Sequence, residues 1–231
     1  MIFEQLFDIK SSTYTYIISS GKGREALIID PVIENTDEYI KVLKNLDLKL
    51  VKVIDTHIHA DHISGLNELS KRTKCSKIMG EKSNSEILDI RVKDNEKIKI
   101  ENIELISMYT PGHTDCSYSF LMNNRVFTGD TLLINGTGRT DLQSGSSHDA
   151  YHSLFNKLLK LPEKTLVFPA HDYNGKKHST IENEKNNNPR LQVKSAEEYA
   201  EMMNGLSLES PEMIDIAVPA NIKGFTLDHI N

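Results

Sequence analysis

The sequence predicts an α/β protein in which β-sheets are covered by helices, and it predicts one domain over residues 1–231. Three observations lead to this fold class. Short apolar segments that suit strands alternate with amphipathic helical patterns as far as about residue 80. Four short strand patterns then follow one another from about residue 98. Helical patterns return after residue 147, on both sides of one more strand pattern.

The first part of the chain predicts a hairpin followed by a strand–helix–strand unit. The hairpin is expected because two strand-like segments, 2–7 and 13–19, are separated by polar residues. Asn35, with Glu38 three residues later, is the pattern of a capped helix start. The predicted elements of this part are strands at 2–7, 13–19, 26–31, 50–55 and 76–79, and helices at 35–46 and 64–72.

The second part predicts short strands and then helices. Asn123 and Asn124 suit a hairpin turn between the last two strands of the series. A glycine-rich loop at 135–141 precedes a helix whose apolar residues keep helical spacing. The last residues, from about 222 to 231, are expected to form a variable tail. The predicted elements here are strands at 98–100, 103–109, 118–122, 125–128 and 165–168, and helices at 147–161, 179–187 and 195–203.

The composition excludes several classes of protein. Hydrophobic residues make up 38% of the chain and charged residues 26%, as in ordinary globular enzymes. The formal net charge of −6 argues against nucleic acid or an anionic membrane as partner. The N-terminus lacks the pattern of a secretory signal. Cys75 and Cys116 suggest free thiols in a reducing compartment, and we expect a cytoplasmic protein.

The most informative stretch is Thr56 to His62, which contains the pattern HxHxDH. It lies where the predicted strand at 50–55 passes into the next helix. Neutral imidazole is the commonest metal ligand, and a short loop at a strand end can direct several imidazoles to one point. The stretch therefore predicts a metal site, with a chance cluster of surface histidines as the alternative interpretation.

Three further ligand-type residues also follow strand patterns, and glycine or proline beside each allows the chain to turn sharply. Taken singly, a histidine at a strand end is also consistent with a structural hydrogen bond. Together with the first cluster they predict one shared site. The seven candidate ligands are His57, His59, Asp61, His62, His113, Asp130 and His171.

The four motifs HxHxDH, PGHT, TGD and PAHD together resemble the metallo-β-lactamase superfamily over most of the chain. The resemblance implies an αββα sandwich of two mixed β-sheets flanked by helices, with metal at one edge. In dinuclear members two cations activate a water for hydrolysis, so the ligand inventory alone suggests a dizinc hydrolase. The corresponding sets here would be His57, His59 and His113 for one metal and Asp61, His62 and His171 for the other, with Asp130 bridging.

The residues around these motifs are similar to a narrower family, the persulfide dioxygenases, also called sulfur dioxygenases. This resemblance runs from about Phe3 to Asn221, and its discriminating elements are Gly138 to Asp141 and His171 to Tyr173. It implies an oxidoreductase that uses dioxygen and water to convert glutathione persulfide into glutathione and sulfite. Such an enzyme would serve sulfur metabolism and hydrogen sulfide detoxification.

In that family one non-haem Fe(II) is held by two histidines and one aspartate, which correspond to His57, His113 and Asp130. Two imidazoles and a carboxylate on one face of an octahedral iron leave positions open for substrate and dioxygen. This assignment rests on the family, because spacing alone does not explain why four good ligands stay free. The resemblance implies that those four lie beside the iron and orient its ligands: His59, Asp61, His62 and His171.

Substrate recognition requires fixed positive charge, because glutathione carries two carboxylates and one ammonium group. Arg139 and Arg190 match family positions near the tripeptide, and the planar guanidinium suits carboxylates. We therefore expect Arg139, Asp141, Tyr173 and Arg190 to bind substrate, with Arg139 and Tyr173 also as catalytic candidates. In the alternative interpretation Arg139 only pairs with Asp141, and Tyr173 only packs.

Two other functions stay open. One is a dinuclear zinc thioester hydrolase of the glyoxalase II type, which would be expected to carry a longer helical C-terminal region and His-Glu-Tyr at positions 171–173. The other is a non-catalytic metal-binding or redox-sensing module. Relatives in the resembling family are often dimers, so a homodimer is one expectation for the assembly.

Overall fold

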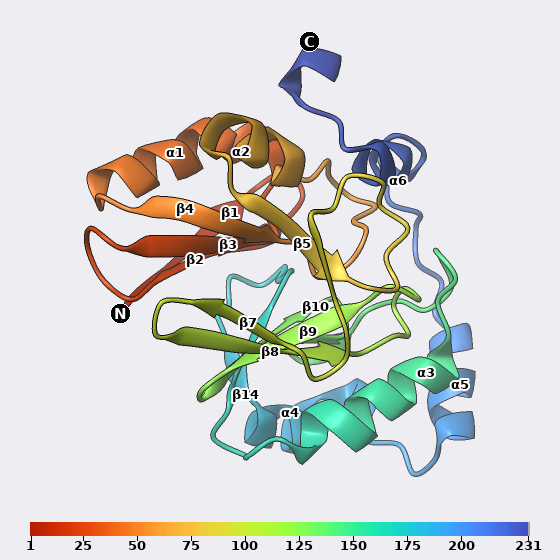
Figure 1. Cartoon of the computed structure of the whole chain (residues 1–231). Coiled ribbons are helices and arrows are strands. Elements are labelled where there is room, and N and C mark those ends of the chain that lie inside the picture. The colour runs from red at the N-terminus through yellow and green to blue at the C-terminus, as the bar shows by residue number, and fades with distance from the viewer. Residues whose placement is uncertain (231) are drawn as a thin grey trace.

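Two six-stranded mixed β-sheets stack face to face in the computed structural model, which describes residues 1–230 (Figure 1). In the first sheet the strands lie side by side in chain order, antiparallel from β1 to β3 and parallel from β3 to β6. Its strands are β1 (Ile2–Asp8), β2 (Thr13–Ser19), β3 (Glu25–Ile29), β4 (Lys49–Ile54), β5 (Ser76–Gly80) and β6 (Ile90–Val92).

The second sheet consists of an antiparallel meander extended by two later strands. Its order is β14-β13-β10-β9-β8-β7, and β13 runs parallel to β10. A short hairpin of β11 and β12 follows β10. The strands of this half are β7 (Lys97–Ile100), β8 (Ile103–Tyr109), β9 (Tyr118–Met122), β10 (Arg125–Gly129), β11 (Leu132–Leu133), β12 (Gly136–Thr137), β13 (Leu166–Pro169) and β14 (Ser179–Thr180).

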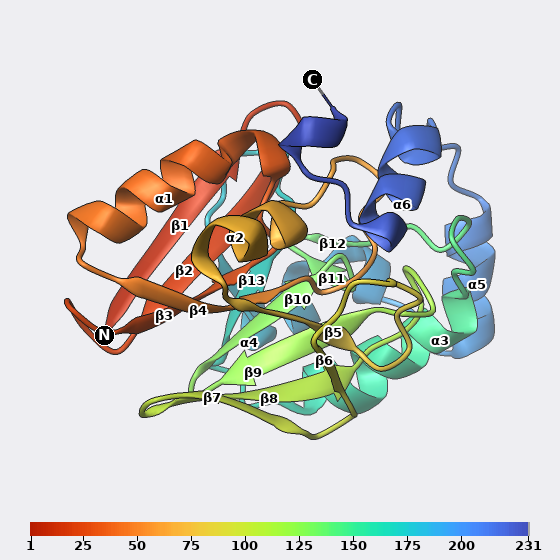
Figure 2. The ribbon, with the colours of Figure 1, turned by 45° about the horizontal axis from the view of Figure 1, so that its top comes forward.

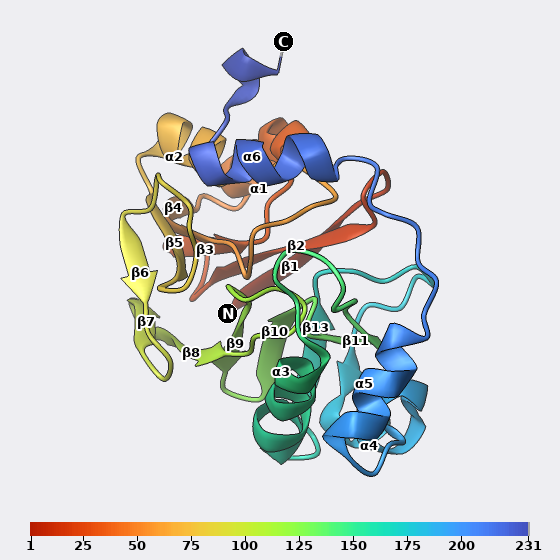
Figure 3. The same cartoon turned by 90° about the vertical axis from the view of Figure 1, so that its right-hand side faces the viewer.

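Helices cover the outer face of each sheet, which gives the four layers of the expected sandwich (Figure 2). Beside the first sheet lie α1 (Thr36–Asn45), α2 (Leu66–Thr73) and α6 (Ile214–Lys223) (Figure 3). Beside the second sheet lie α3 (Ser147–His152), α4 (Ile181–Asn187) and α5 (Ala196–Asn204). The predicted fold class is confirmed. Within residues 1–230, no helix combines the length and apolar composition needed to cross a bilayer.

The space between the sheets is filled by side chains that alternate along the strands. Tyr16 and Ile18 of β2 join the cluster between the sheets, whereas Ile17 joins the cluster under the helices. The ring of Tyr16 packs against Phe127 of β10, with ring centroids 4.9 Å apart. Strand β2 is therefore buried on both faces, between the second sheet and the helices.

The predicted helix start at Asn35 is right in position but wrong in mechanism. Asn35 precedes α1, yet its side chain accepts no hydrogen bond from the helix. Its amide donates instead to the carboxylate of Asp8, at 3.0 Å. The hydroxyl of Thr36 supports the turn by donating to the Ile33 carbonyl, at 2.7 Å. A contact with the β1–β2 hairpin has therefore replaced the local cap.

One predicted helix changes form along its length. The helix expected at 147–161 is α3 only as far as His152, and it continues as a π turn (Ser153–Lys157) and a 3₁₀ turn (Leu158–Lys160). In the widened turn the Ser153 hydroxyl donates to the Pro111 carbonyl, at 2.6 Å. The sequence predicted neither β6 nor α6, because β6 is three residues long and α6 contains Pro219.

Part of the segment assigned to a variable tail packs on α2. The Asn67 amide donates to the Gly224 carbonyl, and Lys71 forms an ion pair with Asp228. A 3₁₀ turn at Leu227–His229 follows. Asn231 lies outside the described residues.

The substitution Gly80→Ala tests the close approach of the two sheets. A Cβ at Gly80 would lie 2.0 Å from the ring of Tyr118 in β9, so the sheets would have to separate. We expect the free energy of unfolding to fall by about 1–3 kcal/mol, measured by chemical denaturation. Gly21→Ala is the control, because the nearest atom to its Cβ is 3.9 Å away. Equal stability of the two variants would contradict this packing.

Candidate metal centre

The structure brings all seven predicted ligand residues to one edge of the sandwich, at the carboxyl ends of β4, β8, β10 and β13. Parallel pairing of β3 with β4, and of β10 with β13, directs these strand ends to the same side. The edge is therefore built from loops of both sheets, held by rigid strands.

The ligand set expected for iron forms one compact group. One donor atom each from His57, His113 and Asp130 lie within 4.8 Å of one another. His113 Nε2 is 3.6 Å from Asp130 Oδ2, while the other carboxylate oxygen, Asp130 Oδ1, is buried without a hydrogen-bond partner in the described chain. Buried polar atoms are normally satisfied, so this oxygen indicates a missing cation or donor.

Each histidine of the site has one ring nitrogen held by a neighbour, which leaves the other nitrogen free as a ligand. His57 and His113 are held at Nδ1, by Thr56 Oγ1 at 2.9 Å and by the Arg139 carbonyl at 2.8 Å. His59 is held at Nε2, so its free atom is Nδ1. The free nitrogens of His59 and His62 are buried and have no partner among residues 1–230. These donors fit a divalent metal ion.

A buried aspartate that the sequence analysis did not select, Asp30, holds the HxHxDH loop. Its carboxylate accepts from the Thr56 backbone N–H at 2.7 Å, the Thr56 hydroxyl at 3.0 Å and His59 Nε2 at 3.2 Å. Asp30 directly follows β3, just as the predicted ligands follow their strands. The sequence analysis places Asp30 inside the strand predicted at 26–31. Its position at the end of that strand is nevertheless the pattern that selected the other candidate ligands.

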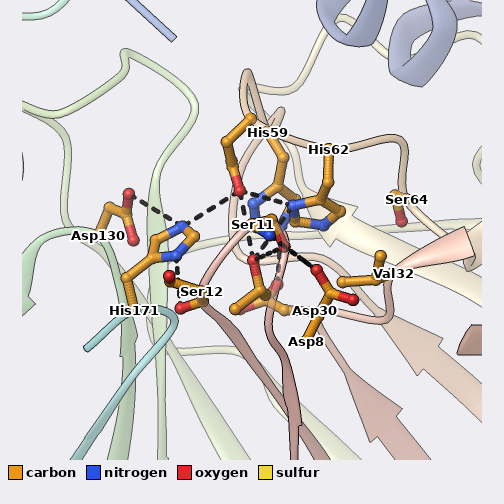
Figure 4. Close-up of polar contacts among 12 residues, drawn as sticks. Asp8, Ser11, Ser12, Asp30, Val32, His59, His62, Ser64, Asp130 and His171 are labelled. Carbon is orange, nitrogen blue, oxygen red and sulfur yellow. Dashed lines mark hydrogen bonds and ion pairs between the residues drawn. The ribbon is translucent and has the colours of Figure 1, made fainter. Parts of the chain in front are cut away.

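The turn between β1 and β2 supports the far side of the site (Figure 4). His171 Nδ1 donates to the Ser12 carbonyl at 3.0 Å, and its Nε2 lies 3.6 Å from both Asp61 Oδ2 and Asp130 Oδ2. The Thr13 hydroxyl lies 3.3 Å from Asp61 Oδ2. His171 is thus fixed between the two carboxylates by a loop more than 150 residues away in sequence.

Helix α6 fixes the backbone of the HxHxDH loop through one side chain. The amide of Asn221 donates to the carbonyls of His59 and His62, at 2.9 and 3.0 Å. Its oxygen accepts from the Ser64 N–H, at 2.8 Å. The C-terminal segment that matched the resembling family thus has a structural role at the metal loop.

Charge and burial favour ligand-competent protonation states at His57 and Asp61 but not at His59. Burial lowers the pKa of His59, but the hydrogen bond and charge of Asp30 outweigh it and raise that pKa to about 10. Burial, followed by the charges of His59 and His113, lowers the pKa of His57 well below its ordinary value, so His57 is neutral. Burial raises the pKa of Asp61, but the charges of His62 and His171 outweigh it and lower that pKa well below its ordinary range. Neutral imidazole and ionised carboxylate are the forms that bind metal.

A cleft of about 420 Å³ opens directly over this group. Arg139, Tyr173 and Arg190 line it, together with Asp61, His113, Asp130 and His171. The ring of Tyr173 lies parallel to that of His171, with centroids 6.1 Å apart. Asp141 does not line the cleft, and instead forms a two-point ion pair with Arg139, at 2.7 Å for each contact. Three of the four predicted substrate residues thus face the cleft directly.

A second group of donors adjoins the first. One atom each from His59, Asp61 and His62 also lie within 4.8 Å of one another. Donor geometry alone is therefore compatible with one metal or with two.

The chain is similar to known proteins along most of its length. The model of the metallo-beta-lactamase superfamily matches residues 9–171. The mitochondrial persulfide dioxygenase ETHE1 of Mus musculus is 41% identical over 226 residues, which cover 96% of this chain and 88% of that protein. The hydroxyacylglutathione hydrolase of Dictyostelium discoideum is more distant, at 31% identity over 78% of this chain and 70% of that protein. The crystal structure of ETHE1 from Myxococcus xanthus superposes with a TM-score of 0.94 at 44% identity, covering 96% of this chain and 98% of that one.

Asp55, which lies next to the metal loop, should make the stability of the folded protein depend on pH. Burial raises the pKa of its carboxyl group from 3.8 to about 7. A carboxyl group that binds its proton more tightly in the folded state destabilises that state as pH rises between the two pKa values. Asp55→Asn removes this effect, so the variant should gain stability over the native protein between about pH 4 and pH 7.

Thermal denaturation at several pH values, at constant metal content, measures this difference. Asp149→Asn, at an exposed position, is the control. Parallel stability profiles for the native protein and Asp55→Asn would show that Asp55 does not titrate in this range.

Proposed function

The chain belongs to the persulfide dioxygenase family of the metallo-beta-lactamase superfamily, and from this premise we propose that its substrate is glutathione persulfide. The enzyme is a persulfide dioxygenase, an oxidoreductase. In the proposed reaction, glutathione persulfide, dioxygen and water yield glutathione and sulfite. The observation that carries the proposal is similarity to persulfide dioxygenase along almost the whole chain, together with a matching fold.

We propose that the metal is one Fe(II) per chain, held by His57, His113 and Asp130. The support is the compact group that these side chains form, with two imidazoles and a carboxylate oxygen that has no other partner in the described chain. Bound there, iron supplies redox chemistry and open coordination positions for dioxygen and substrate. Thr56 and the Arg139 carbonyl keep the two imidazoles in the orientation that this requires.

The remaining four candidates, in this proposal, orient the site without binding iron. Asp30 fixes His59, and Asp61 pairs with His62 Nδ1 at 2.9 Å. His171 Nε2 lies 3.6 Å from Asp130 Oδ2, so it can hold that carboxylate oxygen in place. These contacts give each residue a role that does not need a second metal.

The cleft residues are proposed to bind the substrate. Arg190 uses Nη1 to hold the Thr137 carbonyl, and its other N–H groups are available to a carboxylate. Tyr173 can donate its hydroxyl near the sulfur, close to His171. Asp141 acts through Arg139, which it orients at the cleft wall. Arg139 and Tyr173 are the catalytic candidates because they line the cleft beside the metal residues.

The second candidate function is a dinuclear zinc thioester hydrolase. The group formed by His59, Asp61 and His62 favours it, because these donors are close enough for a second metal. His171-Asp172-Tyr173 and the closer similarity to persulfide dioxygenase count against it. The cleft is lined by several of the candidate metal ligands, which counts against a non-catalytic metal-binding or redox-sensing module.

We propose the cytoplasm as the compartment, since both cysteines are buried free thiols. The mammalian relatives are named mitochondrial, which is also compatible with reduced thiols. A homodimeric assembly is a proposal that rests on the family resemblance.

Metal analysis combined with oxygen uptake tests the function. Anaerobically purified protein should contain about one iron per chain and consume oxygen only when glutathione persulfide is added. Sulfite should form in step with oxygen uptake. Two zinc ions per chain, no oxygen uptake and rapid thioester cleavage would establish the hydrolase instead.

The variant Asp130→Ala tests the ligand set. Loss of one of three ligands should lower iron content and activity together, by about tenfold or more. Asp115→Ala is the matched control, since Asp115 is an exposed aspartate two residues from His113. Iron content at the native level in Asp130→Ala would exclude Asp130 as a ligand.

A further inference from the structure

A nine-residue strap, residues 205–213, joins α5 to α6 and passes along the cleft. It leaves the second-sheet side of the molecule and reaches the first-sheet side (Figure 3). Leu208, Glu209 and Pro211 of this strap line the cleft over the metal residues. The strap therefore supplies part of the wall that a substrate meets.

Arg139 fixes the strap in this position. Its Nη1 donates to the Glu209 carbonyl at 2.6 Å, and its Nη2 lies 3.4 Å from the Leu208 carbonyl. Residues 207–210 form no other backbone hydrogen bond within the described part of the chain. Since Asp141 holds the other edge of the guanidinium, Arg139 is a rigid support for Glu209.

The side chain of Glu209 has no partner within residues 1–230, neither a hydrogen bond nor an ion pair. The same cleft presents the guanidinium of Arg190, which forms no ion pair in that part of the chain. Asp61 and Asp130, the other carboxylates that line the cleft, contact histidines. The cleft wall thus offers separated positive and negative groups that are free for a ligand.

We propose that Glu209 binds the ammonium group of the γ-glutamyl end of the substrate, and so makes the enzyme selective for persulfides that carry an amine. The inference rests on the proposed function, because it assigns one end of glutathione persulfide to this carboxylate. A carboxylate and an ammonium group carry opposite charges and attract each other. Arg190 and the remaining N–H of Arg139 suit the substrate carboxylates. The cleft volume of about 420 Å³ falls within the range of small-ligand sites.

A pair of substrates isolates this contact. Glutathione persulfide is compared with its des-amino analogue, in which hydrogen replaces the ammonium group and the rest is unchanged. The native enzyme should favour glutathione persulfide in kcat/KM by about tenfold, the size expected for one charged hydrogen bond. Glu209→Gln should raise KM for glutathione persulfide by about the same factor and abolish the preference between the two substrates.

Glu212→Gln is the matched control. Glu212 belongs to the same strap, but it lines a neighbouring cleft, beside Asp8 and Glu34, which shares only Asp61 and Pro211 with the first. It should keep the native preference for the amine. A preference that persists in Glu209→Gln, or that is lost equally in Glu212→Gln, would overturn the proposal.

Binding without turnover separates this inference from the proposed function. Calorimetric titration with S-methylglutathione and its des-amino analogue measures the same preference as a ratio of Kd values. A tenfold ratio that disappears in Glu209→Gln supports the ammonium site even if no persulfide is oxidised, in which case the proposed function is wrong. Equal Kd values in the native protein overturn the ammonium site even if persulfide oxidation is observed.

Discussion

The carboxylate of Asp30 is the contact on which the metal loop depends. It is almost completely buried, and three donors from the next strand end satisfy it: two from Thr56 and one from His59. A buried carboxylate without such partners would be strongly unfavourable, so this loop conformation and the charge of Asp30 require each other. Because Thr56 in turn holds His57, the same contact orients a proposed metal ligand.

Pairing of parallel strands brings the residues at neighbouring strand ends together. Strands β3 and β4 place Asp30 beside the HxHxDH loop, and β10 and β13 place Asp130 beside His171. The two sheets meet across a tightly packed interior in which Gly80 leaves room for the ring of Tyr118. A rigid interior keeps the two parts of the metal centre in register, since four of the seven candidate ligands follow a strand of the first sheet and three follow strands of the second.

The substrate side of the centre combines a local ion pair with a long-range contact. Asp141 and Arg139 form a two-point ion pair, and Arg139 then supports a strap that crosses from one layer of helices to the other. Arg139, which the family resemblance assigns to substrate binding, therefore also has a structural role. Most of its N–H groups bind Asp141 or the backbone carbonyls of the strap. Arg190, Tyr173 and the strap line the same cleft, where we propose that they share substrate recognition with Arg139.

The sequence by itself determined the longer strands and most helices, the seven candidate ligands at strand ends and the family, because these are encoded in short-range periodicity and in motifs of a few residues. It did not determine that Asn35 would bind Asp8 instead of capping α1, or that Glu209 would line the cleft. Each of these depends on a contact between segments far apart in the chain. Only packing of the two sheets and their helices brings such segments together, and no local pattern records which partner a polar side chain will meet.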